Sequence, residues 1–452
     1  MKKRMYYLFL LLWIAGGISL VSCSDDNDIE ENGSEIQDPL VDDVEVKVLK
    51  DKSYTVEEMA DMLFGADGAN NDESFADLRQ QFLAHNDEMA KEIEDKVGSN
   101  GVTMSYRSIE YLYTSVDQHG EPVELSSMVW WGQYWLPFFG WNDLDPNNIY
   151  LVEHFTITSN DECPTSSKAK EQVSLGDNLV IMPDYIGYGY TRNRLHPYLN
   201  HEVCAQNSID ALYAGYKIFL ENSDAKLEGD WGLYVLGASQ GGGNALAVHK
   251  YLDTHPWMAE SWRFQYSYCC AGPYSPELTM RKYLEWGKMS YPCVIPMVVK
   301  SMLDSYPNIL GKWKEEDFYS SKYCDIKQEV DRMLAEKELD ADAINKKMKE
   351  LIGTKEILIK DLVSEDMMNA NSEMAKAFFE CLKKQDLTTG WTPKHLIKLY
   401  HGKSDDVVPY ENATLLVDNF GKGKVDLFNS SVGGGHIFTC VKWYGTLMVN
   451  NW

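Results

Sequence analysis

Short apolar segments alternate with longer amphipathic ones through the middle of the chain. Strand-like runs at residues 105–115 and 123–131 flank a Gly-Glu-Pro sequence, and this pattern predicts a β-hairpin. The signals that follow are, in chain order, strands at 149–156 and 178–183, a helix at 207–221, a strand at 232–236, a helix at 241–252 and a strand at 264–271. Strands that alternate with helices predict an α/β fold, with a mainly parallel sheet and helices on both faces.

Two segments depart from this alternation. Residues 44–97 carry apolar positions at helical spacing and predict a helical addition packed on a larger domain. Residues 276–390 show no convincing strand, and charged, helix-favouring stretches fill 325–352 and 364–384. We interpret this block as a helical cap over a site, with structural decoration as the alternative. Strand signals then return at residues 396–400 and 424–428.

The first residues have the pattern of a targeting segment. Three basic residues precede an apolar run at residues 5–21, and Leu20-Val21-Ser22-Cys23 follows. This end resembles the signal of Bacteroidetes-type lipoproteins, which implies that Cys23 is lipidated and that residues 24–43, which are acidic, form a tether. The implied location is the cell envelope, anchored to the outer membrane, with exposure at the cell surface left open. A plain signal peptide and a membrane-spanning helix are the alternatives.

The predicted organisation has six parts. They are a signal peptide at 1–22, an acidic tether at 23–43, a helical segment at 44–97, a first core part at 98–275, a helical cap insertion at 276–390 and a second core part at 391–452.

The composition limits the classes of molecule that the protein is expected to bind. A formal net charge of -27 over 452 residues excludes the basic footprint of a nucleic-acid-binding protein and disfavours adsorption on anionic lipid. Eight cysteines remain besides Cys23, an even number that permits disulfides outside the cytoplasm. No C-x-x-C pair occurs, so no zinc site is expected. The only predicted contact with a membrane is the N-terminal lipid anchor.

The strongest chemical signal is Gly237-Ala238-Ser239-Gln240-Gly241. It lies between a predicted strand and a predicted helix, which is the context that the G-x-S-x-G pattern requires. A sharp strand-to-helix turn exposes the serine hydroxyl, and side chains larger than hydrogen at the two glycines would block that turn. The pattern predicts that Ser239 is a nucleophile; a glycine-rich turn with an incidental serine is the alternative.

A nucleophilic serine needs a base and an acid that orients it. Asp405 follows the strand at 396–400, and His436 follows a glycine-rich loop after the strand at 424–428. Residues 401–409 resemble the H-G-x-x-D-x-x-V-P segment of many α/β hydrolases, which place the serine, the acid and the histidine in this order along the chain. The resemblance implies that Asp405 is the acid and that His436 is the base. Asp406 is the neighbour that could be confused with Asp405, and His401 is interpreted as a turn residue.

These motifs resemble the α/β-hydrolase superfamily, and in particular the secretory lipase and esterase family. The segments at residues 183–190 and 196–198 are similar to the P-D-Y-x-G-x-G and H-P-Y sequences of that family. The resemblance implies an α/β-hydrolase fold and a catalytic triad of Ser239, Asp405 and His436. It also suggests Tyr185 and Tyr188 as substrate-binding residues, with packing of the loop as the alternative.

An oxyanion needs fixed N–H donors. The backbone N–H of Gln240, directly after the nucleophile, is the first candidate. The second is the backbone N–H of Phe155, because His154-Phe155-Thr156 resembles the H-G-T segment of secreted lipases with phenylalanine in place of glycine.

The predicted function is a secreted serine hydrolase that cleaves a small-molecule, glycan or lipid ester through an acyl-enzyme, with no metal and no organic cofactor implied. Two alternatives stay open. One is a serine peptidase of the prolyl-oligopeptidase type, because Gly242 extends the pattern to G-x-S-x-G-G. The other is an inactive surface binding lipoprotein on a hydrolase scaffold.

Overall fold

The described part of the chain forms one compact unit. The computed structural model describes residues 39–64, 73–166, 177–227, 229–430 and 434–449. Residues 38–452 cluster as one compact unit. Cys23, the predicted signal peptide and most of the predicted tether lie outside the described residues. Among the helices that are described, none is both long enough and apolar enough to cross a membrane.

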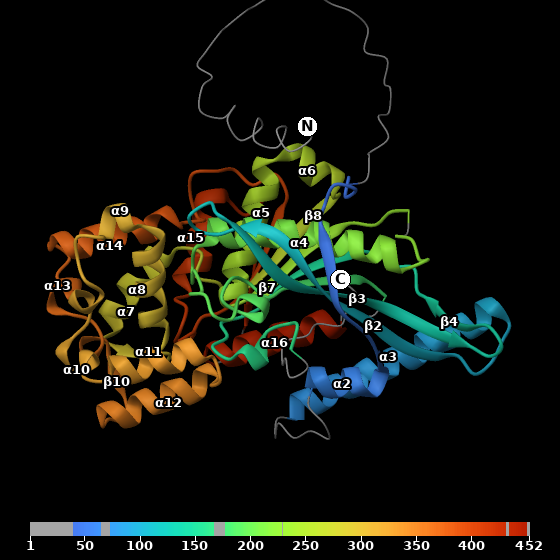
Figure 1. Ribbon diagram of the computed structural model, residues 1–452, viewed down its shortest axis with the longest axis horizontal. Helices are drawn as coiled ribbons and strands as arrows, with labels where there is room; N and C mark the ends of the chain where they lie inside the picture. Colours follow the sequence, from blue (N-terminus) through green and yellow to red (C-terminus); the bar gives the residue numbers. More distant parts are fainter. Residues whose placement is uncertain (1–38, 65–72, 167–176, 228, 431–433, 450–452) are drawn as a thin grey trace, which may run out of the picture. The chain divides into compact units, whose positions relative to one another are not determined.

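A ten-stranded sheet runs through this unit in the order β1-β2-β3-β6-β5-β7-β8-β11-β12, with β4 paired to β3 (Figure 1). Neighbours are parallel from β6 to β12 and antiparallel from β1 to β6. The bounds are β1 Val46–Thr55, β2 Thr103–Val116, β3 Pro122–Leu136, β4 Gly140–Asp143, β5 Ile149–Glu153, β6 Leu179–Pro183, β7 Leu233–Ala238, β8 Phe264–Cys270, β11 Leu396–Gly402 and β12 Val425–Ser430. The predicted hairpin and the predicted parallel strands are confirmed.

Helices cover both faces of the sheet because successive strand residues point to opposite sides. Leu151 belongs to the core under α4 (His201–Asn222), α5 (Gln240–Thr254), α6 (Pro256–Ser261) and α15 (Glu411–Phe420). Its neighbours Tyr150 and Val152 belong to the core under α2 (Val56–Phe64), α3 (Glu73–Val97) and α16 (His436–Val449). The chain therefore has the three-layer α/β architecture that the sequence predicts.

Between β8 and β11 the chain forms a helical insertion with a core of its own. Apart from the short paired strands β9 (Lys288–Met289) and β10 (Ile357–Leu358), its main elements are helical. These helices are α7 Pro276–Trp286, α8 Val294–Ser305, α9 Pro307–Leu310, α10 Ser321–Cys324, α11 Lys327–Glu336, α12 Ala341–Ile352, α13 Glu365–Met368 and α14 Glu373–Lys384. Figure 1 shows them in yellow and orange at one end of the sheet.

Lys337 fastens this insertion to the core. It follows α11 with a left-handed φ of 54° and ends the helical pattern that the sequence suggests for residues 325–352. Its buried ammonium donates hydrogen bonds to the carbonyls of Gly187, Arg192 and Arg194, the last two at 2.7 Å. A single charged side chain thus bridges the insertion and the loop between β6 and α4.

The prediction of helix throughout residues 44–97 is wrong at its start. Val46–Thr55 forms β1, which pairs antiparallel with β2 at the edge of the sheet. Nearly all of its side chains are exposed, and Lys47, Lys50 and Lys52 give it the charged character of a protected edge strand. Because neither face of this strand is buried, its sequence lacks the regular alternation of apolar and polar residues by which a strand is predicted.

Candidate active site

Ser239 stands at the turn between β7 and α5. Its backbone has φ 55° and ψ -121°, and its N–H donates to the carbonyl of Cys270 at 2.8 Å. A positive φ strains a residue that has a Cβ by about 1 kcal/mol or more, and such strain gathers at functional sites. The turn holds the serine at the carboxyl end of the central strands, where open α/β sheets place their ligands.

The glycines on either side of Ser239 are required by close backbone contacts. A Cβ at Gly237 would lie 2.1 Å from the carbonyl oxygen of Gly241. A Cβ at Gly241 would lie 2.0 Å from the carbonyl oxygen of Glu153 and 2.7 Å from that of His154. The turn therefore packs directly against the chain that leaves β5, and only glycine fits at these two positions.

His436 joins Ser239 to Asp405. Its Nε2 lies 2.8 Å from Ser239 Oγ, and its Nδ1 lies 2.8 Å from Asp405 Oδ2. In the neutral imidazole, which is the form that acts as a base, Nδ1 carries the proton because a carboxylate only accepts, and Nε2 accepts the serine O–H. Burial disfavours the charged imidazolium, but the charges of Cys440 and Asp405 and the hydrogen bond to Asp405 outweigh it and raise the pKa of His436. The three predicted triad residues are thus brought together in the expected order.

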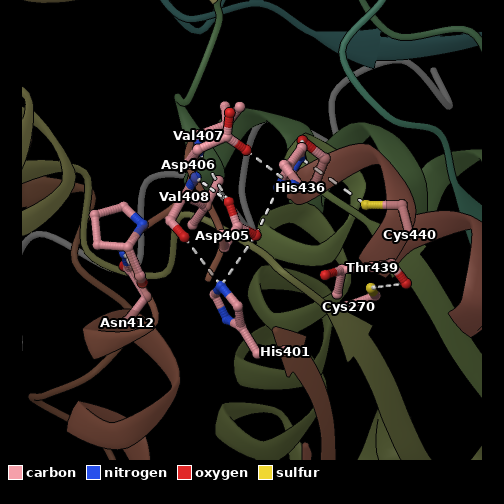
Figure 2. A network of polar contacts seen from close by, with 12 residues as sticks. Cys270, His401, Asp405, Asp406, Val407, Val408, Asn412, His436, Thr439 and Cys440 are labelled. Atoms are coloured by element: carbon pink, nitrogen blue, oxygen red, sulfur yellow. Dashed lines mark hydrogen bonds and ion pairs between the residues drawn. The ribbon is translucent and has the colours of Figure 1, made fainter. Parts of the chain in front are cut away.

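Asp405 is held by a network of donors (Figure 2). Its Oδ1 accepts the backbone N–H groups of Val407 and Val408, at 2.9 and 2.8 Å. Burial acts to raise the pKa of this carboxyl, but the charges and hydrogen bonds of His436 and His401 outweigh burial and hold the pKa below its ordinary value. Asp405 therefore presents a fixed, ionised Oδ2 to the imidazole.

Asp406 serves a different partner. Its Oδ1 accepts the backbone N–H of His436 at 3.0 Å, so it caps the start of α16 rather than contacting the imidazole. A Cβ at Gly435 would lie 2.6 Å from the same oxygen, which explains the glycine before His436. Gly433 of the predicted glycine-rich loop lies outside the described residues.

The interpretation of His401 as a turn residue is wrong. His401 belongs to β11 and is fully buried beneath Asp405. Its Nε2 lies 3.0 Å from the carbonyl oxygen of Val408 and 3.3 Å from Asp405 Oδ2. Both partners are acceptors, so Nε2 carries a proton and donates toward the carboxylate. His401 is a second imidazole on Asp405, which the sequence does not reveal because β11 continues two residues past the predicted strand end.

The oxyanion candidates lie on the two segments that meet at Gly241. Gln240 is the first residue of α5, where backbone N–H groups have no partner within the helix. Its buried side-chain amide lies 2.7 Å from His196 Nε2, which fixes it. Phe155 comes directly after Glu153 and His154, whose carbonyl oxygens contact Gly241. The donor role of both N–H groups stays a prediction.

Tyr185 and Tyr188 are packed inside their loop. Both rings are at most 2% exposed. The Tyr185 hydroxyl donates to the carbonyl of His154 at 3.3 Å, that of Tyr188 donates to Ile157 at 2.5 Å, and the ring of His154 stacks on Tyr185. The described contacts correspond to the packing alternative, and contact with a substrate stays a prediction.

Two thiols border the triad. All eight described cysteines are free thiols. Cys440, one turn into α16, places its sulfur 3.9 Å from His436 Nε2, and Figure 2 shows Cys270 on the side of Thr439 next to it. No motif in the sequence points to Cys440, although its spacing of four residues from His436 puts both side chains on one helix face.

Glu153 is a buried acid at the base of the serine turn. It is fully buried, and the side chains of Ser208 and Tyr185 are its polar neighbours. Burial raises its pKa to about 7 from an ordinary value of 4.5. Glu153 thus binds its proton more tightly in the folded chain than in the unfolded one.

We expect Glu153→Gln to flatten the dependence of stability on pH. Because the folded pKa is the higher one, the stability contribution of Glu153 is fully present below about 4.5 and is lost as pH rises through about 7. The substitution should therefore stabilise the chain above pH 7, by up to roughly 3 kcal/mol. Urea unfolding at pH 5 and pH 8 measures this, and a variant that loses stability equally at both values contradicts the prediction.

Comparison with known proteins bears on the fold. No protein-family model matches the chain, and no curated protein matches it. Among solved structures, the rice cell wall degrading esterase LipA from Xanthomonas oryzae aligns over 89% of this chain and 96% of its own, with a TM-score of 0.61 and 17% identity. A candidate hydrolase from Legionella pneumophila aligns over 90% of this chain and 96% of its own, with a TM-score of 0.61 and 17% identity. The protein has the α/β-hydrolase fold.

Proposed function

We propose that this protein is a serine hydrolase that cleaves carboxylic esters. The observation that carries the proposal is the continuous hydrogen-bonded path from Ser239 Oγ through His436 to Asp405, with both distances at 2.8 Å. The strained, glycine-flanked turn that presents Ser239 supports the same assignment. LipA, which shares the fold, is named as an esterase.

The proposed mechanism is acyl transfer in two steps. His436 Nε2 takes the proton of Ser239 as the oxygen attacks the ester carbonyl, and Asp405 stabilises the imidazolium that forms. The backbone N–H groups of Gln240 and Phe155 are the proposed donors to the oxyanion. His436 then protonates the leaving alcohol, and a water molecule activated by the same imidazole hydrolyses the acyl-enzyme.

Hydrolysis of p-nitrophenyl esters from acetate to palmitate, beside dipeptide anilides, tests the proposal. The intact chain should hydrolyse at least one ester, and Ser239→Ala should lower kcat by about 10⁴-fold or more without changing Km greatly. The chain-length profile then separates a small-ester esterase from a lipase. Serine-dependent cleavage of anilides alone would establish a peptidase, and no labelling of Ser239 by a serine-directed phosphonate would favour a binding protein.

We also propose that Cys23 carries the lipid anchor. The support is the basic, apolar and small-residue pattern before Cys23, followed by an acidic stretch. Metabolic labelling with a radioactive fatty acid should mark the intact chain and leave Cys23→Ala unlabelled. Equal labelling of both would contradict the anchor and would leave the hydrolase proposal untouched.

A further inference from the structure

The tip of the β3–β4 hairpin exposes four aromatic side chains. The tip, defined as residues 135–141, reads Trp-Leu-Pro-Phe-Phe-Gly-Trp. Phe138 is 102% exposed, Phe139 79%, Trp141 53% and Trp135 37%. A soluble monomer rarely leaves so many large apolar side chains together in water, and such patches mark interaction sites.

The conformation of the tip offers no folding reason for these residues. Phe138 has φ 73°, a left-handed conformation that a bulky residue adopts only under strain. Glycine or asparagine would adopt it more readily. Because the Phe138 side chain contributes nothing to the core either, neither its conformation nor its packing accounts for phenylalanine at this position.

The four aromatic residues form a layered arrangement. Trp135 and Trp141 are direct cross-strand partners, so their side chains stand on the same face of the hairpin. Phe138 and Phe139 lie beyond them in the turn. Phenylalanine at the apex with tryptophan behind it matches the interfacial region of a bilayer, where tryptophan prefers the headgroup level.

The charges on and near the tip indicate which kind of lipid surface it would bind. The tip contains no charged side chain, and the nearest acid along β4, Asp143, is turned to the body by hydrogen bonds from Trp131, Gln133 and Ser223. Across the fold, the chain after α3 lies against the tip, because a Cβ at Gly101 would be 3.6 Å from Pro137 Cγ, and the Glu94 carboxylate accepts the Gly101 N–H. This acid and the net charge of -27 disfavour anionic headgroups. A bilayer of zwitterionic lipids has no net surface charge and an apolar interior. It is therefore the lipid surface that suits an uncharged aromatic tip on an acidic protein.

The tip lies away from the proposed active site. β3 runs antiparallel to β6, with Ser127 opposite Pro183 and Trp130 opposite Val180. The end of β3 therefore points to the edge where the parallel strands begin, whereas Ser239 stands at their carboxyl ends. Figure 1 shows β4 at the far side of the molecule from the insertion helices.

We propose that residues 135–141 insert into the surface of a zwitterionic phospholipid bilayer and dock the protein there. The inference does not require the lipid anchor.

Co-sedimentation of residues 38–452, which cluster as a compact unit, with phosphatidylcholine vesicles tests the proposal. The matched variants are Phe138→Asn with Phe139→Asn, and Trp257→Asn as a control at an aromatic residue that is 63% exposed on α6. The double variant should lower the partition coefficient by about tenfold or more, and the control should leave it unchanged. Adding phosphatidylserine to the vesicles should weaken binding of the unsubstituted chain.

The controls separate lost docking from lost folding. Asparagine adopts positive φ readily, so the double variant should keep or raise the Tm, and its hydrolysis of a water-soluble ester should equal that of the unsubstituted chain. Three results would overturn the proposal. They are no sedimentation of the unsubstituted chain, equal sedimentation of the double variant, and a self-association that the two substitutions abolish, which would assign the tip to a second copy.

Discussion

Asp405→Asn is expected to lower kcat for ester hydrolysis by about 10⁴-fold. Oδ1 of Asp405 faces the N–H groups of Val407 and Val408, so the carbonyl oxygen of the new amide will keep that position. The NH₂ group then faces His436 Nδ1, and because it only donates, Nδ1 must accept a hydrogen bond from it. The proton moves to Nε2, which can no longer take the proton of Ser239. Steady-state kinetics on the best ester of the panel measures the loss.

Asp406→Asn is the matched control for this prediction. Asp406 contacts the backbone N–H of His436, and an amide oxygen accepts that hydrogen bond as a carboxylate does. We expect kcat to change less than about tenfold, because only a charge at the helix start is removed. Equal losses in both variants would show that a general loss of negative charge, and not the tautomer of His436, sets the rate.

Gly241→Ala is expected to disrupt both folding and activity. Its Cβ would lie 2.0 Å from the Glu153 carbonyl oxygen, which is backbone and cannot rotate away. The start of α5 and the chain after β5 must move apart, at a cost of about 3 kcal/mol or more. Because these segments carry Gln240 and Phe155, a displacement near 1 Å should also lower kcat about 100-fold.

Gly423→Ala provides the comparison. Nothing lies within 4 Å of a Cβ at this position, and Gly423 does not have a positive φ. Its free energy of unfolding and its kcat should stay close to those of the unsubstituted chain. Urea unfolding and ester kinetics on both variants check the pair, and a Gly241→Ala chain of normal stability and activity would contradict the close contact.

The sequence predicts the parts of this protein that depend on local order along the chain. The strand, the glycines and the helix around Ser239 are contiguous, so their geometry follows from a short stretch. Asp405 and His436 are predicted by their positions after particular strands, and in the parallel sheet β7, β8, β11 and β12 bring those strand ends together. Fold class and the meeting of the three residues were therefore accessible without coordinates.

Features that depend on contacts across the fold were not accessible. His401 is recognised as a partner of Asp405 only when β11 is known to extend to Gly402. Glu153 ends an apolar strand and gives no sign that the serine turn will seal it from water. The tyrosines at 185 and 188 look like pocket walls in sequence, yet their hydroxyls find backbone carbonyls inside the loop.

The clamp made by Lys337 has a consequence for how substrates reach Ser239. Swinging the insertion away from the core would pull an ammonium out of three carbonyl contacts while the surrounding backbone oxygens lose their donor. The sequence predicts that the insertion is a cap over the active site. On that prediction Lys337 would hold it as a fixed wall, and the shape and size of the ester would decide admission to Ser239. Turnover would then rise smoothly with substrate concentration, with no abrupt increase when the ester begins to form aggregates.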